Sequence, residues 1–252
     1  MNTTHISERV GILAGMGPAA GVDFVSLFVA ACESWLRAHG RTVTDQAYPE
    51  HWMAQLPVPD RTLALSDPAA AQPLEPLVRG LSQLADLGAC AAAIPCNTAH
   101  AWHGQLQARV PHIELLHMPR ETAAELHRQG VDRVALLATQ GTYRQGLYDT
   151  ALTQAGIACI VPSEQEREWL MQGIYDGVKA GNLLLAQERF EAVGMQLRAA
   201  HGDVPLVMAC TEIPLALPAA ARAREQNWAL VDPSAILAAA LARRAYGGRR
   251  NK

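Results

Sequence analysis

Two cysteines stand at equivalent places in the two halves of this chain of 252 residues. Each follows an apolar run, and each precedes residues that favour the start of a helix: Asn97 and Thr98 follow Cys96, and Thr211 follows Cys210. A helix N-terminus carries partial positive charge and unpaired N–H groups, so both thiols are expected to favour the thiolate form. The alternative for either one is a small buried apolar residue.

Two equivalent thiols suggest a specific reaction. If the two halves face each other across a cleft, one thiol removes a proton from a carbon atom and the other delivers a proton to the opposite face. Such a pair inverts a stereocentre without a cofactor. A disulfide between Cys96 and Cys210 is the structural alternative. It is disfavoured because an odd number of cysteines, five, with no Cys-x-x-Cys spacing indicates a reduced compartment.

The elements that must position these thiols alternate along the chain. Short runs that are apolar throughout, separated by helical patterns, predict parallel sheets covered on both faces. The predicted strands are Val10–Ala14, Ala91–Ile94, Ile113–Leu116, Val134–Ala138, Ile157–Val161 and Val204–Met208. The predicted helices follow Pro18 to about Arg37 and cover Pro68–Leu87, Glu164–Ala180, Leu183–Ala200 and Ser234–Ala245.

The two halves of the chain look like copies. Val10–Ala14 leads into Gly15-Met16-Gly17, and Val134–Ala138 leads into a similar turn at Thr139. Because a cysteine segment follows later in each half, two pairs of similar segments occur in the same order. The predicted fold class is therefore α/β, with two pseudo-symmetric lobes, each a mostly parallel sheet flanked by helices, and the active site between them.

Composition excludes several classes of partner. The net charge of −3 gives no electrostatic footprint for nucleic acid or for a membrane surface. No run of 18 apolar residues exists, so no transmembrane helix is expected. The polar N-terminus lacks the layout of a signal peptide, and a cytoplasmic location is expected. His100 and His103 lie one helical turn apart, but no third ligand accompanies them, so no metal site is predicted.

The motifs together resemble the aspartate/glutamate racemase family of cofactor-independent amino-acid racemases. The resemblance runs from about residue 10 to 215. Its segments are Gly15–Pro18, Pro59–Thr62, Pro95–His100, Gly141-Thr142, Tyr175–Gly181 and Ala209–Pro214. It implies that Cys96 and Cys210 are the paired proton donor and acceptor, that no cofactor is used, and that the protein is a homodimer.

The same resemblance implies substrate-binding roles. Arg61 and Lys179 match positions that hold substrate carboxylates, as a bidentate fork and a point charge respectively. The alternatives are a surface ion pair between Arg61 and Asp60, and a solvated helix end at Lys179. Glycine turns let the backbone approach a ligand closely. The further substrate-binding candidates are Met16, Gly17, Asn97, Thr98, Thr139, Thr142, Thr211 and Glu212.

The expected division of the chain puts residues 1–116 and about 215–252 in the first lobe and 117–214 in the second, with the C-terminal helix returning to the first lobe as in the family. Two places depart from the family pattern: Gly21, and the stretch 45–56 with Tyr48, Trp52 and Met53. If that stretch is a loop lining the pocket, the substrate is bulkier or more apolar than aspartate.

The resemblance implies 1,1-proton transfer at the α-carbon of an amino acid, with aspartate or glutamate as the first expected substrates. Related architectures include hydantoin racemases, maleate isomerases and decarboxylases of malonate-type acids. Two cysteines favour racemisation or isomerisation over decarboxylation with one thiol. A protein that binds a dicarboxylate without reacting is the non-enzymatic alternative, and it does not need two reactive thiols.

Overall fold

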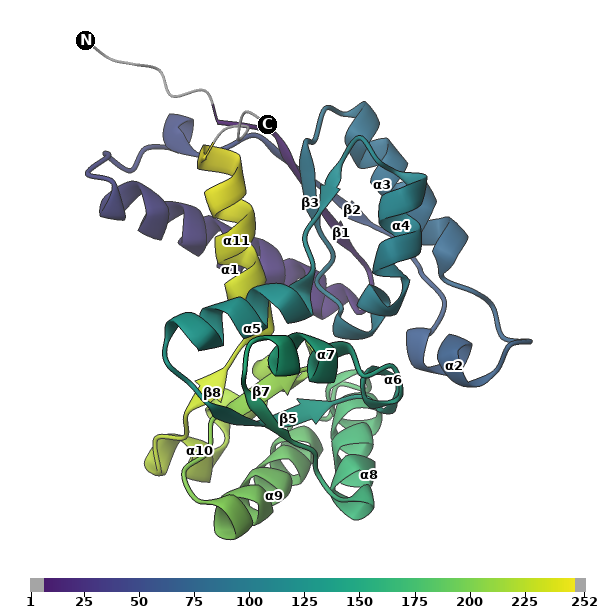
Figure 1. Ribbon diagram of the computed structural model, residues 1–252, viewed down its shortest axis with the longest axis vertical. Coiled ribbons are helices and arrows are strands. Elements are labelled where there is room, and N and C mark those ends of the chain that lie inside the picture. Colours follow the sequence, from purple (N-terminus) through teal and green to yellow (C-terminus); the bar gives the residue numbers. More distant parts are fainter. Residues whose placement is uncertain (1–6, 248–252) are drawn as a thin grey trace.

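The computed structural model describes residues 7–247, and within them the strands form two four-stranded, fully parallel sheets. The first sheet has the order β2-β1-β3-β4 and the second the order β6-β5-β7-β8. Each sheet belongs to one lobe, and the two lobes lie one above the other in Figure 1. The predicted fold class is confirmed.

The first lobe is built from the N-terminal half of the chain. Its strands are β1 (Val10–Ala14), β2 (His51–Gln55), β3 (Ala91–Ala93) and β4 (Glu114–Leu115). Its helices are α1 (Pro18–Ala38), α2 (Arg61–Ser66), α3 (Leu74–Asp86) and α4 (His103–Arg109), with a 3₁₀ helix over Asn97–Trp102. A second short 3₁₀ helix covers Asp45–Ala47.

The second lobe repeats this plan. Its strands are β5 (Arg133–Ala138), β6 (Ala158–Ile160), β7 (Leu206–Ala209) and β8 (Leu230–Val231). Its helices are α5 (Met118–Arg128), α6 (Gln140–Arg144), α7 (Leu147–Gln154), α8 (Glu164–Gln172), α9 (Leu183–His201) and α10 (Ala221–Glu225). A π-helical segment covers Gly173–Val178, and 3₁₀ turns cover Ile213–Leu215 and Leu217–Ala219.

Both faces of each sheet are buried, as runs that are apolar throughout predict. In the first lobe, α1 and the C-terminal helix α11 (Pro233–Tyr246) pack on one face, and α3 and α4 pack on the other. In the second lobe, α8 and α9 cover one face, while α5 and α7 cover the other. The central strand β3 consists of three buried alanines, whose small side chains allow α11 to pack closely on the sheet.

The shared strand order decides where a site can form. In each lobe the first strand lies beside the third, and the second strand lies outside the first. The chain therefore leaves the first strand toward one edge of the sheet and later returns toward the other. Loops at the carboxyl ends of these two neighbouring strands diverge, and ligands bind there in open α/β sheets. In this chain the loops follow β1, β3, β5 and β7.

The C-terminal part of the chain divides differently from the sequence-based boundary. β8 pairs with β7, and the segment from Ile213 to Trp228 packs in the core of the second lobe. α11 alone then crosses back, in yellow in Figure 1, to pack against α1. The chain thus leaves the second lobe between Val231 and Pro233 rather than near residue 215. Residues 1–6 and 248–252 of the predicted first lobe lie outside the described residues.

Several elements were not predicted from the sequence, among them β2, β8 and α5. The sequence has no apolar run at β2, since this edge strand reads His-Trp-Met-Ala-Gln and pairs only with β1. β8 is a two-residue edge strand, and α5 is a polar amphipathic helix. The stretch 45–56, expected as a loop, therefore contains a strand. The predicted helix over 164–180 continues from α8 into the π-helical segment.

Helix α1 is long and apolar enough to cross a membrane by length and composition alone. No uninterrupted apolar run in the sequence predicts a membrane span, but the mean hydropathy along this helix is high enough for one. Core helices pass the same test. One face of α1, including Phe24, Phe28, Cys32 and Leu36, is buried in the core with α11 and β1.

Candidate functional site

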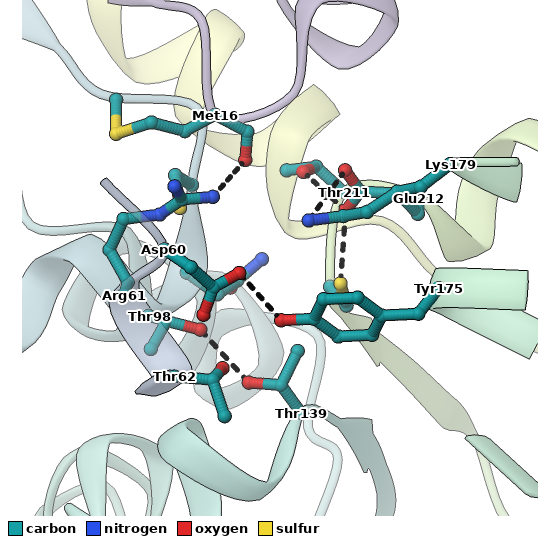
Figure 2. Close-up of a pocket in the computed structure, with 13 residues that line it drawn as sticks. Met16, Asp60, Arg61, Thr62, Thr98, Thr139, Tyr175, Lys179, Thr211 and Glu212 are labelled. Carbon is teal, nitrogen blue, oxygen red and sulfur yellow. Dashed lines mark hydrogen bonds and ion pairs between the residues drawn. The ribbon is translucent and has the colours of Figure 1, made fainter. Parts of the chain in front are cut away.

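One small, polar pocket lies where the two lobes meet. It is lined by loops at the carboxyl ends of β1, β3, β5 and β7, together with the start of α2 and the π-helical segment. Figure 2 shows the lining side chains converging from both lobes. The lining residues are Met16, Asp60, Arg61, Thr62, Cys96, Asn97, Thr98, Thr139, Tyr175, Lys179, Cys210, Thr211 and Glu212.

Cys96 enters this pocket from the first lobe. It is the N-cap residue of the 3₁₀ helix after β3, and only 6% of its surface is exposed. Arg61 lines the same pocket, and its guanidinium is near enough to interact electrostatically with Cys96. Burial alone would lower the pKa of Arg61, but the negative charges of Cys96 and Asp60 hold it above the usual value.

Arg61 is held by the backbone as well. Nη1 donates to the carbonyls of Val58 and Pro59 at 3.1 and 2.9 Å, and Nη2 donates to the carbonyl of Met16 at 2.9 Å. Three of its five N–H groups are thus used inside the protein. This differs from the resemblance, which implies a fork directed at a substrate carboxylate. Arg61 instead joins the loop after β1 to the start of α2, beside Cys96.

Cys210 enters the pocket from the second lobe and has a different environment. Its Sγ donates a hydrogen bond to Oε2 of Glu212 at 3.1 Å, and Thr211 donates to the same oxygen at 3.2 Å. Burial and the neighbouring Glu212 carboxylate raise the pKa of the Cys210 thiol well above its usual value. The expected easier ionisation is therefore wrong at Cys210. The turns after it are too short to offset burial, and a carboxylate faces the sulfur.

Three threonine hydroxyls join the lobes at the base of the pocket. Thr98 Oγ1 lies 2.9 Å from Thr139 Oγ1 and 3.1 Å from Thr142 Oγ1, and the last two lie 3.1 Å apart. Asn97 accepts a hydrogen bond from Tyr148 at 2.5 Å. Its buried Nδ2 has no hydrogen-bond partner within residues 7–247. That N–H group is an available donor on the pocket wall for a ligand carboxylate.

The π-helical segment brings two further side chains to the pocket. Tyr175 donates to Asp60 Oδ2 at 2.9 Å, and Lys179 lies 4.6 Å from the Tyr175 ring and 4.0 Å from Glu212. In Figure 2 Tyr175 reaches across the pocket to Asp60 of the first lobe. Burial alone would raise the pKa of Asp60, but hydrogen bonds from Leu63 and Tyr175 and two nearby cations lower it. The bond therefore links an ionised Asp60 to the opposite lobe.

Removing this link tests its role in closing the pocket. Tyr175→Phe is expected to raise KM roughly tenfold while changing kcat less, because a hydrogen bond to a charged group contributes about 1.5–3 kcal/mol. Steady-state kinetics with the turnover substrate checks this. The matched control is Tyr143→Phe, whose hydroxyl donates to the carbonyl of Leu136 within the second lobe. An unchanged KM in Tyr175→Phe would contradict the expectation.

The structure brings most of the predicted site residues together. Gly17 does not line the pocket, but a side-chain Cβ there would lie 3.2 Å from Glu212 Oε1. Thr142 lies behind Thr98 and Thr139. Asp60, Thr62 and Tyr175 line the pocket without having been predicted as site residues. Their positions inside the motif segments Pro59–Thr62 and Tyr175–Gly181 were the available signal. Tyr48, Trp52, Met53 and Leu56 are not among the lining residues, so the expected bulkier substrate loses its support.

Three histidines cluster near the pocket but do not form a metal site. No group of three or more His, Cys, Asp or Glu within residues 7–247 is arranged to hold a metal ion. The rings of His103 and His117 are 4.6 Å apart, and those of His100 and His117 are 5.1 Å apart. His100 and His103 each contact a backbone carbonyl, Ile94 and Leu115 respectively. Burial, followed by charge repulsion from His103 and Arg120, lowers the pKa of His117 to about 4.

This cluster predicts loss of stability in mild acid. Because the folded-state pKa of His117 is below its unfolded value of about 6.5, the unfolded chain binds more protons between about pH 6.5 and about pH 4. The melting temperature should therefore fall as the pH is lowered through that range. His117→Asn should reduce this dependence, whereas the same change at His39, an exposed helix-end residue, should not. An identical slope in His117→Asn and the wild type would contradict the prediction.

A repeated pair of parallel α/β lobes with one thiol from each lobe in a shared pocket defines the class of protein. The chain belongs to the Asp/Glu/hydantoin racemase family, whose profile matches residues 13–241.

Individual proteins give the same assignment. The chain is 24% identical to the broad specificity amino-acid racemase RacX of Bacillus subtilis, over 91% of this chain and 94% of that protein. The structure is similar to Picrophilus torridus aspartate racemase, with a TM-score of 0.79 and 28% identity over 96% of this chain and 95% of that one. A glutamate racemase of Francisella tularensis in complex with D-glutamate shares the fold, with a TM-score of 0.63 and 15% identity over 98% of this chain and 85% of that one.

Proposed function

We propose that this enzyme is a cofactor-independent amino-acid racemase that acts on aspartate or glutamate through Cys96 and Cys210. One observation carries the proposal: the thiols follow equivalent strands, β3 and β7, of two repeated lobes and line one pocket.

The reaction moves a proton from one face of the α-carbon to the other. One sulfur, as thiolate, removes the α-proton, and the electron pair left on carbon is delocalised into the α-carboxylate. The second sulfur, as thiol, delivers its proton to the opposite face. Groups that donate to the charged carboxylate stabilise this intermediate. The free Asn97 Nδ2 and the threonine hydroxyls of the pocket are such donors.

Charged groups of both signs support a zwitterionic substrate. Lys179 and Arg61 are the cations among the lining residues, and Asp60 and Glu212 are the anions. We assign a substrate carboxylate to Lys179, whose side chain keeps 28% of its surface exposed, and the ammonium group to Glu212 or Asp60. A second carboxylate, in aspartate or glutamate, would use the remaining N–H groups of Arg61.

A panel of single enantiomers tests the substrate assignment. The purified protein is incubated without added cofactor with L- or D-aspartate, glutamate, alanine, serine, arginine or lysine, and the products are separated by chiral chromatography. The proposal expects the fastest inversion with aspartate or glutamate. The broad specificity of the Bacillus subtilis relative is the reason for including neutral and basic amino acids. Faster inversion of the neutral or basic amino acids would change the assigned substrate class. No inversion of any amino acid in the panel would overturn the proposed racemase activity.

A further inference from the structure

His100 lies four positions after Cys96, in the 3₁₀ helix Asn97–Trp102, and only 3% of its surface is exposed. Its Nδ1 atom is buried and has no hydrogen-bond partner within residues 7–247. A buried nitrogen without a partner costs stability, and an apolar side chain of similar size would fill the same space without that cost. What the imidazole offers and an apolar side chain does not is its second nitrogen, Nε2.

The Nε2 atom of His100 contacts the carbonyl oxygen of Ile94 at 3.2 Å. The same oxygen accepts a hydrogen bond from the backbone N–H of Cys96 at 2.8 Å. This second bond closes a γ-turn centred on Pro95, whose ring fixes φ near the value that such a turn needs. The turn comes directly after β3 and ends at the thiol residue. His100 therefore holds the oxygen on which the turn closes.

We propose that His100 is a positioning residue for Cys96: its Nε2–H group holds the Ile94 carbonyl, and the turn that closes on this carbonyl sets where the Cys96 sulfur lies in the pocket. His100 is not among the residues that line the pocket, so it acts through the backbone. The consequence for turnover rests on the proposed function, whereas the turn itself can be tested without a substrate.

The surroundings of His100 fix the state of its ring. Burial, followed by charge repulsion from His117 and His103, lowers the pKa of His100 well below its usual value, so the ring is neutral near pH 7. A carbonyl oxygen only accepts hydrogen bonds, so the single ring proton lies on Nε2 and Nδ1 is bare. The His117 ring lies edge-on at 5.1 Å and the His103 ring at 6.1 Å, and these neighbours restrict rotation of the imidazole.

The second thiol is held in a different way. The residue four positions after Cys210 is Pro214, which has no N–H group to donate. Cys210 instead donates its own hydrogen bond to Glu212 at 3.1 Å. A contact at the sulfur thus orients Cys210, whereas a backbone turn orients Cys96. Loss of the His100 contact should therefore affect only one of the two thiols.

Two substitutions at His100 distinguish its two ring nitrogens. The amide nitrogen of glutamine can reach the place of Nε2, whereas that of asparagine lies nearer the place of Nδ1. His100→Asn should lower kcat by at least about tenfold, because a displacement of about 1 Å can cost about 10²-fold in rate. KM should change less, since Lys179 and Glu212 bind from the other lobe. His100→Gln should restore most of the lost kcat.

The matched control is His103→Asn. It removes a contact of the neighbouring ring with the carbonyl of Leu115, at 2.8 Å, and leaves the Ile94 carbonyl untouched. Its kcat should stay at the wild-type value. Steady-state kinetics with the turnover substrate compares the three variants with the wild type.

NMR of the ¹⁵N-labelled protein tests the turn without a substrate. In the wild type near pH 7, His100 should be the neutral Nε2–H tautomer. The Cys96 amide should exchange with D₂O about fivefold faster in His100→Asn, the effect expected from one lost hydrogen bond. His100→Gln and His103→Asn should keep the wild-type rate. The Ile213 amide, which donates to the carbonyl of Cys210 at 3.0 Å, is the internal reference and should not change.

An Nδ1–H tautomer of His100 in the wild type would overturn the inference, even if neither variant at His100 folded. An unchanged kcat in folded His100→Asn would also overturn it. So would equal losses of kcat in folded His100→Asn and His100→Gln, because the volume of the ring and not its Nε2–H group would then be what matters.

The positioning role and the racemase activity fail separately. If the protein inverts none of the amino acids tested, the tautomer and the exchange rate of the Cys96 amide still decide whether His100 holds the turn. If the protein inverts an amino acid while His100→Asn keeps the wild-type kcat and Cys96 exchange rate, the racemase remains and the positioning role is lost.

Discussion

Replacing either Cys96 or Cys210 by serine is expected to lower the rate of racemisation by at least about 10³-fold, because a positioned acid or base contributes about 10²–10⁴-fold. A serine hydroxyl ionises far less readily than a thiol, so neither role can be filled by the substitute. Both side chains are buried and of nearly the same size as serine. The melting temperature should therefore change little, which chiral chromatography and thermal unfolding of the same sample can check.

The single variants should also differ from each other in a way that a structural defect would not produce. The remaining thiol can still remove and return the α-proton on its own face. Each variant should thus exchange the α-proton of one enantiomer with solvent without inversion, and the two variants should prefer opposite enantiomers. Cys159→Ser, on the edge strand β6 away from the pocket, is the matched control and should retain wild-type activity. Inversion at an undiminished rate in either single variant would contradict the two-thiol mechanism.

Gly15→Ala is expected to cause the largest loss of stability from one added methyl group. Gly15 has a φ of +108°, a conformation that L side chains rarely adopt, and a Cβ there would lie 2.0 Å from the carbonyl oxygen of Leu56. Backbone strain of about 1–2 kcal/mol and overpacking of about 1–3 kcal/mol together lower the free energy of unfolding by roughly 2–5 kcal/mol. Denaturant unfolding measures this loss.

The same substitution should affect the site. Gly15 precedes Met16, whose carbonyl accepts a hydrogen bond from Arg61, and a shift of this turn moves the guanidinium away from Cys96. A displacement of about 1 Å can cost about 10²-fold in rate. Gly40→Ala is the control, since Gly40 also has a positive φ, +63°, but nothing lies within 4 Å of its added Cβ. Equal losses of stability in both variants would show that the contact with Leu56 has no effect.

The central strands of both lobes could be predicted because they are buried on both faces and are therefore apolar throughout. Val10–Ala14 has the predicted bounds, and β5 differs by one residue. The edge strands carry less signal, since β2 pairs on one side only and has exposed side chains. The C-terminal boundary was misplaced because only pairing in space, between β7 and β8, shows that the chain stays in the second lobe until Val231.

The sequence predicted which residues form the site better than it predicted how their side chains interact. Cys96 and Cys210 follow equivalent strands of the two lobes, and the repeated segments of the sequence predicted that equivalence. The pairing of Arg61 with backbone carbonyls and of Cys210 with Glu212 depends on side-chain directions that the sequence does not contain. The same holds for Tyr175, which reaches Asp60 from 115 positions away. The homodimer and the cytoplasmic location stay predictions.

The most direct test of the account is proton NMR of the purified protein in D₂O with L- or D-aspartate, then L- or D-glutamate, without added cofactor. Loss of the α-proton signal is followed in time, and chiral chromatography of the same sample gives the configuration. The account predicts that either enantiomer loses its α-proton and that the inverted product carries deuterium, with both effects abolished in the double variant Cys96→Ser/Cys210→Ser. Retention of the α-proton and of configuration in all four amino acids would contradict it.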